Sequence, residues 1–77
     1  MPAGAEQLLE EWEEEDRELK ELRRRNADWR YIESLPLRVR EAVELYIETG
    51  DLWLAAKLAG MSVDEFNGIR IRAGILW

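Results

Sequence analysis

One proline and three glycines divide the second half of this chain into short segments. Pro36 suits the first turn of a helix and disfavours a helical residue before it. Gly50, Gly60 and Gly74 each follow a helical apolar pattern, and glycine tolerates the positive φ that often ends a helix. These breaks predict three short helices and no strand, with the helices at 36–49, 52–59 and 63–73.

Polar caps and apolar spacing support the same boundaries. Asp51 is a natural N-cap for the helix that begins at residue 52, while Ser62 and Glu65 make a capping box for the next helix. The 36–49 segment carries an apolar face with helical spacing at Val39, Ala42, Val43, Tyr46 and Ile47. Small alanines before Gly60 allow two helices to pack closely at a steep angle, which predicts a helix-turn-helix. An ordinary helical hairpin with a glycine turn asks for nearly the same residues and stays open.

The first half of the chain has a different sequence pattern from the second half. Residues 6–33 contain no glycine or proline and are rich in strong helix formers, so they predict a long helix. A break near Asn26 is the alternative, with Asp28 capping a separate short helix at 29–34. The expected fold class is all-α, with a long N-terminal helix followed by a three-helix unit that contains the helix-turn-helix. Two domains are expected, a charged amphipathic helix at 1–34 and a helix-turn-helix domain at 35–77.

An apolar stripe with heptad spacing follows the first helix and predicts a short coiled coil, although Glu15 does not suit it. The expected oligomer or partner interface comprises Leu8, Trp12, Leu19, Leu22, Asn26 and Trp29. Isolated helices are marginal in water, so the stripe predicts a homodimer. An antiparallel pair would lay the acidic 6–21 segment, at net −7, against Arg23–Arg25 of the other chain. Cover by another protein or by the chain's own core stays open.

Several functional classes are disfavoured by composition. The chain has no cysteine and no histidine, which removes thiolate metal sites and the commonest general base. We therefore expect no enzyme, no cofactor and no metal, and the acidic run 13–16 fits a solvated helix face. No apolar run approaches the roughly 20 residues that span a bilayer, and no secretory signal is recognisable, so a cytoplasmic protein is expected. Abundant Glu, Arg and Trp are compatible with a thermophile source.

The second half also resembles a known family. The run Gly50-Asp51-(x)3-Ala55-Ala56-Lys57-Leu58-Ala59-Gly60-Met61-Ser62-(x)2-Glu65-Phe66, closed by Gly74-Ile75, is similar to short prokaryotic antitoxin-like helix-turn-helix proteins. The resemblance covers about residues 36–76. It implies a small regulator that represses its own operon through the helix-turn-helix and neutralises a partner toxin, usually a ribonuclease, through another segment. The Glu-rich N-terminal segment departs from the short members of that family.

Operator DNA is one expected partner. Phosphates would be contacted by cations, and base edges by the start of the 63–73 helix. The expected DNA-binding residues are Arg38, Arg40, Lys57, Ser62, Val63, Asn67, Arg70 and Arg72. Asp64 and Glu65 would repel phosphates, so a second hypothesis is a protein-protein interaction module. In that hypothesis the helix-turn-helix is a scaffold and the N-terminal helix binds the partner. Trp53 is assigned to the core or rim of the domain.

Overall fold

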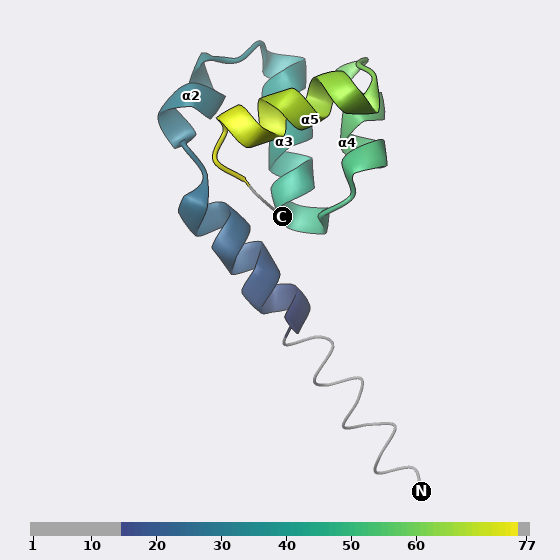
Figure 1. Ribbon diagram of the computed structural model, residues 1–77. Coiled ribbons are helices and arrows are strands. Elements are labelled where there is room, and N and C mark those ends of the chain that lie inside the picture. The colour runs from purple at the N-terminus through teal and green to yellow at the C-terminus, as the bar shows by residue number, and fades with distance from the viewer. Residues whose placement is uncertain (1–14, 76–77) are drawn as a thin grey trace, which may run out of the picture.

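The computed structural model describes residues 15–75 and contains only helices there (Figure 1). Residues 15–26 are helical, and four further helices follow. They are α2 (Trp29–Ser34), α3 (Leu37–Thr49), α4 (Leu52–Ala59) and α5 (Val63–Arg72). The all-α prediction is confirmed for this part of the chain. The helix before α2 ends at residue 26 instead of continuing to Glu33, and the first part of the predicted long helix, residues 6–14, lies outside the described residues.

Side-chain caps explain why the helices begin where the sequence predicts. The Asp28 carboxylate accepts a hydrogen bond from the amide of Tyr31, and Asp51 accepts one from the amide of Leu54 at 3.0 Å. The Ser62 hydroxyl accepts a hydrogen bond from the amide of Glu65, as in the predicted capping box, and donates one to the Glu65 carboxylate. Glycines at residues 50 and 60 adopt the left-handed conformation that ends α3 and α4. The predicted turns near 34–36, 50 and 60 are therefore confirmed.

One core joins α2 to the three helices that follow it. Phe66 of α5 is completely buried and meets Tyr46 of α3 edge-on, with ring centroids 6.3 Å apart. Ile32 of α2 is equally buried in the same cluster, so α2 belongs to this core. The other core residues are Ala42, Val43, Ile47, Ala55, Ala56, Ala73 and Ile75. In Figure 1, α5 crosses α3, and α4 lies alongside.

The link between the first helix and α2 rests on the end of α5. The amide of Asp28 donates a hydrogen bond to the carbonyl of Ala73 at 2.8 Å. Gly74 follows with a φ of +80°, and a Cβ there would lie 2.7 Å from the Asn26 carbonyl oxygen. Ile75 then turns back and is buried. The link between the first helix and α2 therefore lies against the residues that follow α5, and only glycine fits at the point of contact.

Residues 15–26 pack their last turns against the end of α3. The Arg23 Nε donates a hydrogen bond to the Ile47 carbonyl at 2.9 Å, and Arg23 is only 7% exposed. Lys20 forms an ion pair with Glu48 at 2.6 Å, and Arg24 forms a second ion pair with the same carboxylate. Two of the three arginines expected to attract a second chain are thus engaged within this one.

These ion pairs give a testable dependence on pH. The hydrogen bond from Lys20, helped by the charges of Lys20 and Arg24, holds the pKa of Glu48 below its ordinary value. A lowered pKa in the folded state means that the contact stabilises the fold above the unfolded-state pKa and is lost as pH falls through the folded one. In Glu48→Gln, we expect the free energy of unfolding to decline less steeply on acidification below pH 4.5 than in the wild-type protein.

Urea denaturation at stepped pH measures this difference. Glu44→Gln is the matched control, because Glu44 is exposed on the same helix and makes no ion pair with residues 15–75. Its curve should run parallel to that of the wild-type protein. Parallel curves for Glu48→Gln as well would mean that the ion pairs do not form in solution. Because Glu48 is exposed, the difference should also shrink in high salt.

Candidate functional site

Two of the five cations assigned to DNA phosphates are bonded inside the domain. The Arg38 Nε donates a hydrogen bond to the Leu58 carbonyl in the last turn of α4 at 2.9 Å. Arg70 donates from Nε and Nη2 to the Asn67 side-chain oxygen, and from Nη1 to the Ile75 carbonyl at 2.9 Å. The Arg70 guanidinium also lies 5.9 Å from the Tyr46 ring centroid. A phosphate contact by Arg38 or Arg70 would compete with these bonds.

Arg23 and Arg38 serve the ends of two helices. They donate to carbonyls in the last turns of α3 and α4, whereas Arg70 donates to the Ile75 carbonyl beyond the end of α5. The last carbonyls of a helix lack partners within it and carry the negative end of its dipole, so a guanidinium stabilises them twice over. Sequence analysis assigned Arg38 and Arg70 to DNA and Arg23 to a dimer, and the helix-end contacts were missed.

The remaining predicted DNA ligands form a sparse set. Lys57 and Arg72 are exposed and make no ion pair with residues 15–75, while Arg40 is half-buried. Ser62 is used in the capping box, and the first turn of α5 is acidic through Asp64 and Glu65. Phosphate-driven binding needs several cations on one face. The start of α5, which would face the DNA bases, instead carries the carboxylates of Asp64 and Glu65.

A groove of about 910 Å³ lies between α4 and the start of α5, and we call it the HTH groove. Its lining residues are Asp51, Trp53, Leu54, Ala56, Lys57, Met61, Ser62, Val63 and Asp64. Trp53 is 75% exposed, so its assignment to the core or rim is wrong. The spacing could have shown this: Ala55, Ala56 and Ala59 face the core, which turns Trp53 and Lys57 outward one turn apart.

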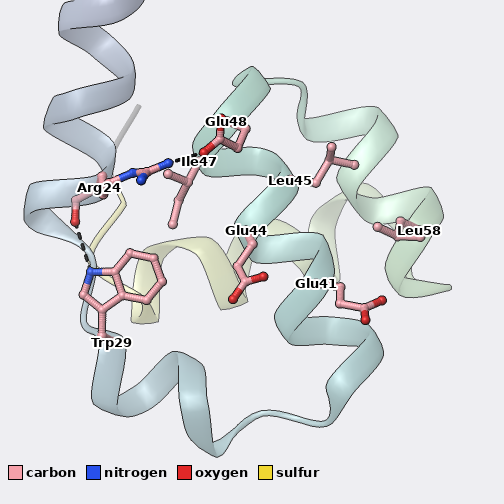
Figure 2. A pocket seen from close by; sticks show the side chains of 8 residues that line it. All are labelled: Arg24, Trp29, Glu41, Glu44, Leu45, Ile47, Glu48 and Leu58. Atoms are coloured by element: carbon pink, nitrogen blue, oxygen red, sulfur yellow. Dashed lines mark hydrogen bonds and ion pairs between the residues drawn. The ribbon is translucent and has the colours of Figure 1, made fainter.

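A second groove of about 500 Å³ runs along α3, and we call it the α3 groove (Figure 2). Its lining residues are Arg24, Trp29, Glu41, Glu44, Leu45, Ile47, Glu48 and Leu58. The Trp29 indole N–H donates to the Arg24 carbonyl at 3.2 Å, which fixes the ring at one side of the groove. Figure 2 shows the Glu44 carboxylate between this ring and Glu41.

The described residues of the predicted oligomer interface do not share one environment. Leu19 and Trp29 are each 39% exposed, Leu22 is half-buried, and the Asn26 backbone lies against Gly74. Leu8 and Trp12 lie outside the described residues. Trp29 belongs to α2, beyond the break after residue 26, so it does not continue the helical seam. The homodimer stays a prediction.

Residues 15–75 hold no cluster of carboxylates arranged to bind a metal ion, and no helix among them is long and apolar enough to cross a bilayer. Comparison with protein-family models, curated proteins and solved structures finds no match for the chain. The candidate sites of residues 15–75 are therefore the two grooves, the HTH groove and the α3 groove.

Proposed function

We propose that this chain is a protein-binding module of antitoxin type, in which the helix-turn-helix is a scaffold and the HTH groove receives the partner. The observation that carries this proposal is Trp53, a large apolar side chain 75% exposed beside the apolar floor of a groove. Tryptophan is the residue most enriched among those that dominate binding energy in protein interfaces. The resemblance of residues 36–76 to antitoxin-like proteins points to a toxin protein as the partner.

The residues that line the HTH groove suit an amphipathic helix. Leu54, Met61 and Val63 provide apolar contact, and Asp51 and Asp64 place carboxylates at the rim with Lys57. A helix that lays its apolar face into such a groove is a recurring mode of protein recognition. Nucleic acid would find few of the contacts it needs there, since the carboxylates oppose phosphates.

Operator binding is the second candidate function. It is favoured by the helix-turn-helix arrangement of α4 and α5, and by the exposed cations Lys57 and Arg72. In that case the protein would repress its own operon, as the resemblance implies. Because Arg38 and Arg70 donate hydrogen bonds within the domain, fewer cations are free to bind phosphate than the sequence suggested.

The protein encoded by the neighbouring gene is the partner to test first. Titration calorimetry with that protein should give a saturable complex, and Trp53→Ala should weaken it by about tenfold or more, as expected for a central aromatic anchor. Leu37→Ala is the matched control, because Leu37 is 60% exposed and lines neither groove. It should leave the affinity unchanged.

A DNA-binding measurement separates the two candidate functions. Under operator binding, fluorescence anisotropy with the DNA upstream of the gene would show affinity that falls steeply with salt. Lys57→Ala together with Arg72→Ala would then make the DNA affinity less dependent on salt, whereas Trp53→Ala would not change the salt dependence. We expect no sequence-specific complex with this DNA. Equal binding of the partner by Trp53→Ala and by the wild-type protein would contradict the proposed function.

A further inference from the structure

The α3 groove is a surface that the proposed role of the HTH groove does not use. It is separate from the HTH groove, since the two grooves share no lining residue. Its walls come from four parts of the chain, namely the end of the first helix, α2, α3 and α4. The α3 groove is therefore a second candidate binding surface on the same small domain.

The charge of the α3 groove is negative and largely uncompensated. Glu48 is neutralised by Lys20 and Arg24. Glu41 and Glu44 are exposed and form no ion pair with any of residues 15–75. They stand three residues apart on α3, a spacing that places both carboxylates on one side of the helix. Two like charges held side by side favour a ligand that brings positive charge.

An aromatic face and an apolar floor accompany these carboxylates. The Trp29 ring is held by its hydrogen bond to the Arg24 carbonyl and remains 39% exposed. Leu58 is 36% exposed, and Leu45 is half-buried one turn after Glu41 on α3. A guanidinium stacks on an indole face and binds a carboxylate in its own plane, so Trp29 beside Glu44 matches arginine in particular.

We propose that the α3 groove binds a cationic amphipathic segment of a partner protein. One arginine of that segment stacks on Trp29 and bonds to Glu44, a second cation one turn away meets Glu41, and an apolar side chain on the same face covers Leu45 and Leu58. Phosphate groups, acidic peptides and anionic lipids are repelled by the same carboxylates. The charge of the α3 groove therefore favours a cationic segment over these anionic ligands.

A designed peptide tests this proposal directly. The probe is an alanine-based helical peptide with two arginines four residues apart and one leucine on the same face. The control peptide has glutamine at both arginine positions. We expect the probe to shift the Trp29 indole N–H resonance saturably in ¹H–¹⁵N spectra, and the control peptide to leave it unmoved. Glu41→Gln with Glu44→Gln should weaken probe binding by about tenfold or more, as expected for loss of charge-assisted hydrogen bonds.

A second double variant separates the groove from general charge attraction. Glu18→Gln with Glu33→Gln removes the same charge from exposed positions outside the α3 groove and should leave probe affinity unchanged. Equal weakening by both double variants, or the absence of a saturable shift, would overturn the proposal. So would sedimentation equilibrium in which Glu41→Gln with Glu44→Gln dissociates a dimer, because the occupant would then be a second copy. Trp53→Ala should not alter probe binding, so failure of one groove does not imply failure of the other.

Discussion

Replacing Gly74 with alanine is expected to lower the free energy of unfolding by about 3 kcal/mol, because two separate penalties act at one residue. The backbone has a φ of +80°, a conformation that side chains with a Cβ rarely adopt. The new Cβ would also lie 2.7 Å from the Asn26 carbonyl oxygen, closer than such atoms approach in folded proteins. Relief of that clash would pull Asp28 away from the Ala73 carbonyl.

Gly68→Ala is the matched control for this experiment. Gly68 lies inside α5, and a Cβ there would meet nothing within 4 Å. Alanine should raise the free energy of unfolding by up to about 1 kcal/mol, the difference between the two residues in a helix interior. Guanidinium denaturation followed by circular dichroism measures both variants. If the two alanines changed stability alike, the contact between Gly74 and Asn26 would not exist in solution.

The second large effect is expected at Arg23. Arg23→Met keeps much of the side-chain volume but removes the guanidinium that donates to the Ile47 carbonyl and lies 3.2 Å from where a Gly50 Cβ would stand. The carbonyl would then lose a charge-assisted hydrogen bond at the negative end of α3, which is worth about 2 kcal/mol. Arg23 is 7% exposed, so water can replace the lost donor only if the helix moves away.

Arg25→Met tests whether Arg23 acts through this contact. Arg25 is exposed and belongs to the same helix, so its loss removes an equal charge without breaking a bond to α3. We expect a change within about 0.5 kcal/mol, as is usual for surface substitutions. Urea denaturation in low and high salt measures both variants, and the Arg23 effect should survive salt because the bond is buried. Equal effects at the two positions would refute the helix-end role of Arg23.

Local signals explain how much of the fold could be predicted from the sequence. Asp51 and Ser62 cap the helices that follow them, and Gly50 and Gly60 end the helices before them, as their neighbours in the chain indicated. Such signals act over three or four residues and do not need the tertiary structure. The end of the first helix was open because Asp28 could equally have continued a helix or capped a new one.

The roles of the arginines could not be predicted in this way. Arg23 and Arg38 reach carbonyls 24 and 20 residues away, which only the packing of the helices brings close. In the sequence, an arginine that serves a helix end looks like one that binds phosphate. The resemblance to antitoxin-like proteins favoured phosphate, whereas the structure shows that Arg70 is bonded to Asn67 and Ile75.

The two grooves differ in how far the sequence pointed to them. Helical spacing could have placed Trp53 on the outer face of α4. The α3 groove needed Trp29 and Leu58, from different helices, to be set on either side of the α3 glutamates. No periodicity along one segment contains that arrangement, because it is a property of three segments together.

The contact between Asp28 and Ala73 has a consequence for the order of events during folding. The α4–α5 hairpin joins neighbours in the chain and closes only a short loop, whereas the Asp28 contact must bring distant residues together. We expect this contact to form after the local ones, on the native side of the folding barrier. A defect at Gly74 should therefore leave the folding rate almost unchanged and shorten the lifetime of the native state.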